Sequence, residues 1–463
     1  MIRTDVWSLK VTPSKKKLLL LTVAEYRKFL KPLVFIVNAE WKTIGNLTDK
    51  EKINYLEKSI HVTSNNPNPK YSYYQKAINK YPSFRKFPNY LRRAAIADAI
   101  GIVSSFQTRY REWQSGIRKN KKVRPPRLTA MCQSYPALYK GQQVKYNNDY
   151  QNVSLKVRNA PPLSTLNSIQ GGSAVWNGFD WVLLTEIPVK SHGLNRHKVI
   201  GNQIKSPALV VNSKTCQLSM PVKVKPIKKE DSDYVCSVDL GINNAATCSI
   251  VGRDGTVKAR KFINPARDID RRNKRKMMIA KKSKQTHKKI RQKFVKGFCR
   301  GLYRKSSNIN LEISRKVSRE IIEFAKLHDV KVIVIENLAG WKAKAGKKGT
   351  LMRQKFHLWC HGKIVEILNN RWAELGGIVQ TVNPKYTSAY AFDGSGKVKR
   401  SKKNYSLCTF PSGKQYNADL CASNNIGARY WYSVLIGDKY FSKVFVSQSS
   451  TNTLRTPVTL GTL

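Results

Sequence analysis

Apolar residues recur with helical spacing in one long stretch of the first third of the chain. In residues 90–119, "YLRRAAIADAIGIVSSFQTRYREWQSGIRK", they follow one another at intervals of three and four: Ile96, Ile100, Val103, Phe106, Tyr110, Trp113 and Ile117. This spacing places side chains on a single face of a helix. We expect the stripe to be a core face rather than a platform on which bases stack.

Strand-like runs lie on both sides of this helical region. Before it, within residues 1–24, stand "VWSLKV" and "KLLLLTV"; after it stand "NVSLKV", "DWVLLTEIPV", "ALVV" and "QLSMPVKV". The last two runs surround the turn "NSKTC" and predict a hairpin. Together the runs predict a small β-barrel, built from residues 1–24 and 146–232, that is interrupted by a helical insert at 25–145.

From about residue 233 the pattern alternates between strands and helices. A strand in "YVCSVDLGINNAATCSIVGRDG" ends at Asp239, and a hairpin follows at "GRDG". After a basic helical segment at 264–305, the buried strand "VKVIVIE" ends at Glu336. Further along, a helix, the strand "GIVQTV" and a helix with Asp419 in its first turn are expected. The pattern predicts an α+β multidomain protein.

The charge of the chain points to a polyanionic partner. It has 463 residues, 85 Lys and Arg against 28 Asp and Glu, and a net charge of +57, while 41% hydrophobic content is ample for packed cores. Such a charge favours binding to nucleic acid. No apolar stretch is long enough to span a bilayer and no signal peptide is evident, so we expect a cytoplasmic, nucleoid-associated protein of a bacterium or archaeon with no membrane partner.

Basic residues cluster in the long helix and in the segment 264–305. The candidate nucleic-acid contacts are Arg92, Arg93, Arg109, Arg111, Arg271, Arg272, Lys274, Arg275, Lys288 and Lys289. A run of like charges on an isolated helix repels itself and is more stable against phosphates. The alternative is that these side chains only form solvated helix faces.

The cysteines do not indicate a metal site or a disulfide framework. All eight are scattered, and no CxxC pair occurs. In "HLWCH", His357 and His361 have the spacing that places two imidazoles on one helix face, beside Cys360. No third ligand stands at a matching distance, so we expect reduced thiols and no bound zinc.

Three acids are surrounded by apolar or small residues in a chain otherwise full of lysine. They are Asp239, Glu336 and Asp419, at two strand ends and one helix start. Any one of them alone could be a helix cap or a surface partner. Taken in the order strand, strand, helix, they predict the catalytic site of a ribonuclease H-like fold. Carboxylate oxygens suit Mg²⁺ or Mn²⁺, and two such ions would bracket a scissile phosphate.

The residues around these acids also resemble a known family. "VDLGINNAATCSI", "VIVIENL" and "ADLCASNNIGARY" are similar to the three RuvC motifs as they occur in TnpB proteins, transposon-encoded RNA-guided endonucleases close to compact type V CRISPR effectors. The resemblance is best over about 235–430. It implies a RuvC-like nuclease core at 233–384 and 417–435, an N-terminal wedge barrel with a helical recognition insert, a C-terminal tail at 436–463, and guide RNA and target DNA as partners.

One segment departs from that family. Similar proteins carry two cysteine pairs before the last acid, whereas residues 385–416 hold Cys408 alone. We therefore expect this degenerate zinc-ribbon-like segment to be a basic loop without metal. Cys421 stands where similar proteins often have Asn, and because Asp419 is kept, metal binding should persist.

Several functions remain open at this point. The main hypothesis is an RNA-guided DNA endonuclease that recognises a short motif beside its target. The alternatives are a guided DNA-binding protein or repressor without cleavage, a transposase of the ribonuclease H-like superfamily, and a structural RNA-binding protein of ribosomal type. A repressor tends to lose acids that are all present here, and a transposase usually ends its triad with Glu. Whether the protein is a monomer or a homodimer is not indicated.

Overall fold

The chain folds into two compact units, which are described separately. They are Met1–Lys225, the N-terminal unit, and Pro226–Leu463, the C-terminal unit. The computed structural model describes residues 2–61, 65–71, 88–117, 124–129, 133–159, 180–183, 186–189, 201–225, 227–242, 244–290, 295, 297–338, 358–401 and 404–436. His357 and nearly all of the expected tail lie outside these ranges. No described helix is long and apolar enough to cross a membrane.

Helices form much of the N-terminal unit. They are α1 (Pro13–Ala39), α2 (Trp41–Ile44), α3 (Asp49–Ile60) and α5 (Asn89–Gln114). The strand expected over "KLLLLTV" is wrong, because this run belongs to α1. Leucine is a strong helix former, and the helix is started by Pro13 in its first turn and by Thr12, whose side chain accepts a hydrogen bond from the Lys15 amide.

The apolar stripe of α5 is buried only along its first half. Ile96, Ile100 and Val103 are buried, and α5 packs there against α1 and α3. Phe106, Tyr110 and Trp113 are only half-buried. Ile117 lies beyond the helix and is 70% exposed. The expected core face is therefore correct for the first four turns and holds only in part at the aromatic end.

Two small sheets accompany these helices. One contains β1 (Ile2–Ser8), β6 (Gln203–Ile204), β7 (Ala208–Val211) and β8 (Cys216–Lys223). The antiparallel pairing of β7 with β8 confirms the predicted hairpin. The other contains β2 (Val144–Tyr146), β3 (Asn152–Asn159), β4 (Asp180–Leu183) and β5 (Ile187–Pro188). A β-bridge from Leu9 to Val189 joins the ends of β1 and β5.

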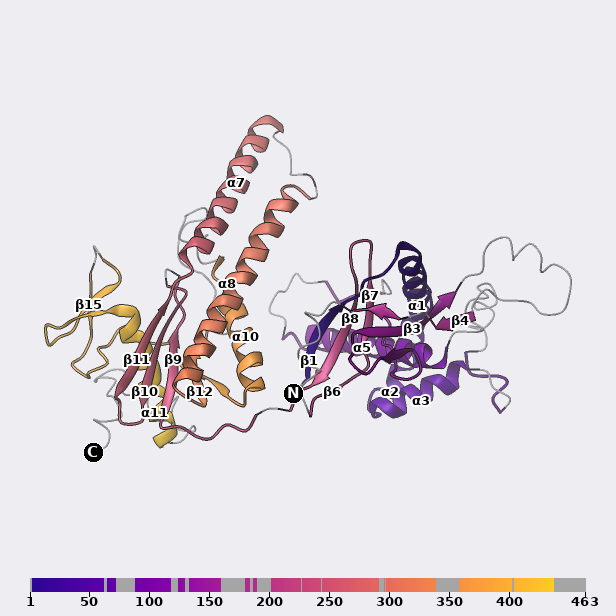
Figure 1. Cartoon of the computed structure of the whole chain (residues 1–463), viewed down its shortest axis with the longest axis horizontal. Coiled ribbons are helices and arrows are strands. Elements are labelled where there is room, and N and C mark those ends of the chain that lie inside the picture. Colours follow the sequence, from indigo (N-terminus) through magenta and orange to yellow (C-terminus); the bar gives the residue numbers. More distant parts are fainter. Residues whose placement is uncertain are drawn as a thin grey trace. The chain divides into compact units, whose positions relative to one another are not determined.

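The C-terminal unit is built on a five-stranded sheet, seen edge-on in Figure 1. The order is β11-β10-β9-β12-β13. The strands are β9 (Tyr234–Asp239), β10 (Ala246–Gly252), β11 (Val257–Ile263), β12 (Val332–Glu336) and β13 (Ile378–Val382). The first three are antiparallel, whereas β12 runs parallel to β9 and to β13. The predicted strand ends at Asp239 and Glu336 are confirmed.

Strand alternation decides which side chains face which helices. Cys236 and Val238 of β9 join the core under α8 (Arg300–Leu327) and α10 (His361–Glu374). Val235 of β9 and Val334 of β12 join a separate cluster with Ile426 of α11 (Ala418–Ile436). Because alternate residues share a face, Asp239 and Glu336 belong to the α11 side.

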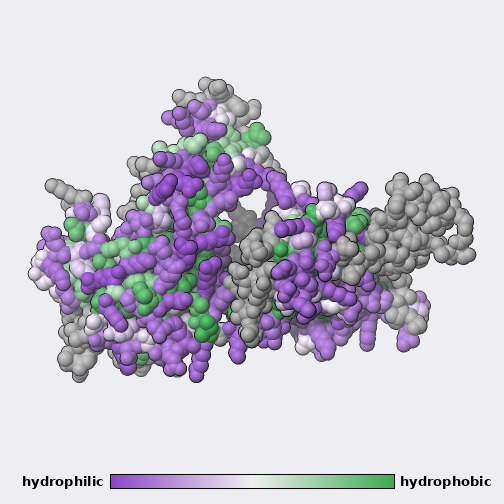
Figure 2. Space-filling view, viewed as in Figure 1, coloured by the Kyte–Doolittle hydropathy of each residue, from purple (hydrophilic) through white to green (hydrophobic). Residues whose placement is uncertain are grey.

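The predicted basic helix forms one arm of a long hairpin. It is α7 (Ala266–Ile290), which packs against α8 and extends with it beyond the sheet (Figure 1). Ile279 is buried in its distal half, and Met277 and Met278 are exposed. Figure 2 shows hydrophilic residues over most of this projection. The hairpin thus presents charge on an arm that the sheet does not cover.

The segment expected as a loop between β13 and α11 instead contains a small sheet. Its strands are β14 (Lys399–Arg400), β15 (Leu407–Thr409) and β16 (Gln415–Asn417). Its core is aromatic: the ring centroids of Phe392 and Tyr416 lie 5.0 Å apart, and those of Phe392 and Phe410 lie 5.6 Å apart. Cys408 and Cys421 complete this core. The aromatic rings supply apolar burial at this small sheet.

Small residues let α11 approach the sheet closely. The Ser249 and Ser423 hydroxyls lie 2.6 Å apart, and the Trp431 indole N–H donates to the carbonyl oxygen of Val251 at 3.1 Å. A Cβ atom added to Gly427 would lie 2.7 Å from the Cβ of Val251. The position of α11, and with it that of Asp419, therefore depends on a glycine at 427.

We expect Gly427→Ala to lower the free energy of unfolding by about 1 to 3 kcal/mol, because the methyl group pushes α11 off the sheet. Gly362→Ala on α10 is the matched control: a Cβ there meets nothing within 4 Å, so stability should stay constant or rise by up to about 1 kcal/mol. Denaturant unfolding of both variants measures the difference. Equal effects of the two substitutions would contradict the close packing of α11.

Candidate active site

The three predicted acids converge at one end of the central sheet. In the parallel pair of β9 and β12, Val238 is level with Ile335, so the next residues, Asp239 and Glu336, end neighbouring strands side by side. The first turn of α11 brings Asp419 to the same face. Asn417 caps that helix, since its side-chain oxygen accepts hydrogen bonds from the amides of Asp419 and Leu420, both at 3.0 Å.

The carboxyl groups of the three acids influence one another electrostatically. Burial raises the pKa of the Asp239 carboxyl well above its usual range, and the charges of Glu336 and Asp419 raise it further. Burial also raises the pKa of Glu336, against the hydrogen bond from Thr387 and the charge of Arg429. Like charges that cannot separate disfavour ionisation. A cation between them would reverse this effect.

Polar neighbours orient two of the acids. The Asn244 side-chain amide donates to a carboxylate oxygen of Asp419 at 2.9 Å. The Thr387 hydroxyl donates to a carboxylate oxygen of Glu336. Asn425 of α11 in turn donates to the backbone carbonyls of Thr387 and Tyr390, both at 2.8 Å. The last helix therefore supplies Asp419 and also holds the segment that orients Glu336.

Two arginines add positive charge to this carboxylate cluster. The charge of Arg400, on β14, lowers the pKa of Asp239, although burial and the other acids outweigh it. The Arg400 guanidinium donates to the backbone carbonyls of Tyr405 and Ser388, at 3.3 and 3.1 Å. Arg429 is buried and donates to the Asn383 carbonyl; burial lowers its pKa to about 10, against the charge of Glu336.

Sequence reasoning did not single out these supporting residues. Asn244 lies five positions after Asp239, and Thr387 lies in "NPKYTS", directly after "GIVQTV", so both fall within residues 235–430, where the resemblance to the family is best. Arg400 had no such signal, because it is one of many basic residues in its segment. Only the small sheet β14-β15-β16 brings it near Asp239.

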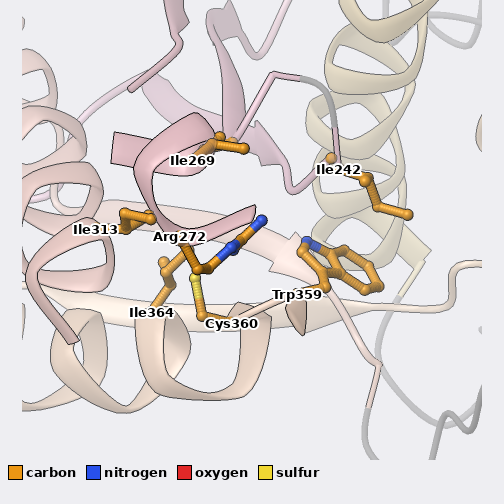
Figure 3. A pocket seen from close by; sticks show the side chains of 9 residues that line it. Ile242, Ile269, Arg272, Ile313, Trp359, Cys360 and Ile364 are labelled. Carbon is orange, nitrogen blue, oxygen red and sulfur yellow. The ribbon is translucent and has the colours of Figure 1, made fainter. Parts of the chain in front are cut away.

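One predicted nucleic-acid contact is wrong. Arg272 is only 5% exposed and lines a small pocket beside the loop after Asp239, as Figure 3 shows. Its guanidinium donates to the side-chain oxygen of Asn310 on α8 and to the backbone carbonyl of Leu358, each at 3.0 Å. Arg272 thus joins α7, α8 and the residues before α10, and its buried guanidinium serves this structural link.

The other candidate contacts divide into two groups. Arg92 and Arg93 bond within the N-terminal unit: Arg92 to the His61 ring at 2.9 Å, and Arg93 to the Glu57 carboxylate. They are better explained as links between α3 and α5. The side chains at Arg109, Arg111, Arg271 and Lys274 are exposed, and that of Arg275 is partly exposed. The side chains of Lys288 and Lys289 lie outside the described part.

The carboxylate groups at this end of the sheet are of the type that binds hard divalent cations. Carboxylate oxygens are the ligands that Mg²⁺ and Mn²⁺ prefer, and a nearby cation would favour the ionised form of the two acids whose pKa is raised. Among the described residues no three His, Cys, Asp or Glu side chains are already arranged around one ion position. Metal binding would therefore require the carboxylates to draw together.

Comparisons with known proteins agree with the motifs. A model described as the Aq_aa04 family matches residues 3–159. The TnpB-like protein aq_aa05 of Aquifex aeolicus (strain VF5) is 29% identical over 235 residues, which cover 48% of this chain and 74% of that protein. The resemblance to TnpB-like proteins is confirmed.

A solved structure supports the same relationship at the level of the fold. The Cas12f1 chain in a Cas12f1–sgRNA–target DNA complex has a TM-score of 0.54 with 14% sequence identity, covering 89% of this chain and 82% of that one. The chain therefore has a mixed α/β multidomain fold similar to that of Cas12f1. At this identity the likeness concerns the fold and does not assign the carboxylates a role.

We expect Asp239→Asn to stabilise the metal-free protein. A carboxyl whose pKa is raised by folding contributes stability below the ordinary Asp pKa, and this is lost as pH rises through the raised value. Asn has no carboxyl to ionise, so the variant does not lose this stability as the pH rises. In EDTA its advantage over the wild type should be near zero at about pH 4 and should grow as the pH rises toward 8. Denaturant unfolding at several pH values measures it.

Glu366→Gln is the control for this substitution, because Glu366 is an exposed acid on α10 that pairs with Lys363 at 2.7 Å. Its stability should match the wild type within about 0.5 kcal/mol. Adding Mg²⁺ should raise the melting temperature of the wild type and of this control but not of Asp239→Asn. A loss of stability in Asp239→Asn at pH 8 in EDTA would contradict the electrostatic account.

Proposed function

We propose that the protein is an RNA-guided DNA endonuclease whose C-terminal unit is a ribonuclease H-like, RuvC-type nuclease domain. The observation that carries the proposal is the convergence of Asp239, Glu336 and Asp419 at one sheet end. The similarity to a TnpB-like protein and the Cas12f1-like fold support it. The Cas12f1 structure contains a guide RNA and target DNA, and we propose the same two partners here.

In this proposal the three acids hold two divalent ions. When bound, the ions supply an activated water and charge stabilisation at the leaving 3′ oxygen of a phosphodiester. Thr387 and Asn244 fix the orientation of Glu336 and Asp419, and Asn425 keeps Thr387 in place. The positive charge of Arg400 lies where it can attract the phosphate of an incoming strand.

The remaining basic surface would hold nucleic acid. The exposed side chains of Arg271 and Lys274, and the partly exposed Arg275, lie on the α7–α8 hairpin, which extends beyond the sheet. Phosphate contacts of this kind give affinity without sequence preference, while base pairing with the guide reads the target. The β-sheets and helices of the N-terminal unit would form the wedge barrel and its recognition insert, with the boundary predicted after residue 24 moved to the start of α1 at Pro13.

The first experiment is to express the chain in a bacterium together with several kilobases of its native flanking DNA and to sequence the copurifying RNA. We expect one abundant RNA with a constant scaffold and a variable end drawn from that flank. This complex should cut matching DNA only when Mg²⁺ or Mn²⁺ is present. Heterogeneous RNA without enrichment of the flank would overturn guided binding.

The Asp239→Ala, Glu336→Gln and Asp419→Ala variants test the site within this complex. Each should lower the cleavage rate at least about a hundredfold, because each removes a ligand of the same ions. All three should keep the copurifying RNA, and Glu366→Gln should cut like the wild type. Cleavage at the wild-type rate by purified Asp239→Ala would refute the assignment. A wild-type complex that binds its target without cutting would favour a guided repressor.

A further inference from the structure

The edge strand β11 places an aromatic side chain in line with the proposed catalytic acids. Thr247 of β10 pairs with Asp239 of β9 on one side and with Phe262 of β11 on the other. Residues directly opposite each other in an antiparallel sheet share a face, so these three residues form one row across three strands. Because neighbouring strands lie about 4.8 Å apart, the row places Phe262 about 10 Å from Asp239.

The row lies on the face of the sheet that α11 covers. Ile263 of β11 belongs to the core on the opposite face, under α8 and α10. Arg260 of β11 pairs with Ser249, whose hydroxyl contacts that of Ser423 on α11. Alternate residues of a strand share a face, so Phe262 lies on the same side as Arg260.

Phe262 is exposed, whereas Thr247 beside it is buried. The helix α11 packs over β9 and β10, and Thr247 is only 1% exposed. The strand β11 forms the edge of the sheet (Figure 1), and Phe262 is 46% exposed. A phenylalanine ring held in the sheet therefore faces solvent in the same row as Asp239.

The charge around Phe262 favours a polyanionic ligand. Residues 253–264 contain four Lys and Arg and one acid. Lys258 and Arg260 precede Phe262 on the same face, and both are exposed. The Arg260 guanidinium lies 5.9 Å from the ring centroid of Tyr416 on the small sheet. Cations attract phosphates, and an unpaired base stacks on an aromatic ring whatever its sequence, so a single strand fits this surface.

We propose that Phe262 stacks on a base of the DNA strand in the active site, one nucleotide away from the phosphate that lies among the acids. The separation along the row is one that a nucleotide spans between its phosphate and its base. Lys258 and Arg260 attract the phosphates that follow along β11. Stacking holds the strand without reading its sequence, so cleavage requires a base at this position but no particular base. This subsite rests on the proposed nuclease function and adds a residue outside the three motifs.

The first test locates the contact without requiring cleavage. A single-stranded oligothymidylate that carries 5-iodouracil is bound to the full-length Asp239→Ala protein and irradiated, because this base bonds covalently to an aromatic ring stacked on it. We expect a crosslink at Phe262 that persists in Phe262→Tyr and is lost in Phe262→Leu. Phe35→Leu is the matched control, since Phe35 is a phenylalanine on α1 that is 54% exposed. It should leave the crosslink unchanged.

The second test measures the need for a base within the RNA complex. Single abasic nucleotides are placed around the mapped cut site of the target strand. In the wild type one position should slow cleavage about tenfold, a loss within the range of base–aromatic stacking. Phe262→Leu should cut the intact strand about tenfold more slowly, and the abasic nucleotide should cause no further loss. Phe262→Tyr, which keeps a ring, should restore the rate.

The outcomes separate this subsite from the nuclease proposal. Crosslinks that avoid Phe262 would overturn the subsite, and so would a Phe262→Leu complex with the wild-type rate and the wild-type response to the abasic position. An equal loss in Phe35→Leu would also overturn it. A protein that crosslinks at Phe262 but never cuts would retain the subsite and refute the nuclease function.

Discussion

The C-terminal unit depends on holding three carboxylates together against their mutual repulsion. Asp239 and Glu336 end neighbouring parallel strands, and α11 adds Asp419 to the same face. Burial and like charge raise the pKa of Asp239, so its charged form is disfavoured unless a cation lies nearby. A chain with a net charge of +57 does not lack positive charge, yet lysine is excluded from the immediate flanks of these acids. This arrangement supports the proposal that metal ions bind there.

Contacts elsewhere in the C-terminal unit hold the three acids in position. The helix α11 is fixed against the sheet by the contact between Ser249 and Ser423, by the small Gly427 and by the Trp431 indole. Asn425 ties the same helix to Thr387, whose hydroxyl meets Glu336. The small sheet packs its aromatic core against the start of α11 and presents Arg400 toward Asp239. The helix α11 therefore links the small sheet, Glu336 and Asp419.

The sequence was sufficient to predict what depends on local pattern. Buried strands ending in an acid, a helix with an acid in its first turn and an Asp-Gly hairpin are visible in short windows, and all were confirmed. Tertiary partners were not visible: Thr387 lies 51 positions from Glu336, and Asn244 lies 175 from Asp419. Charge alone could not separate buried Arg272 from exposed Arg271. An unbroken leucine run suits helix and strand equally, so the first part of α1, before residue 25, was predicted as a strand.

The central claim is that a divalent ion binds among Asp239, Glu336 and Asp419, and its location can be mapped directly. With Fe²⁺ in place of Mg²⁺, ascorbate and peroxide generate hydroxyl radicals that cut the backbone close to the ion. The account predicts cuts clustered near residues 239, 336 and 419, which excess Mg²⁺ suppresses and Asp239→Asn abolishes. Cuts elsewhere in the chain, or cuts at these positions that persist in Asp239→Asn, would contradict it.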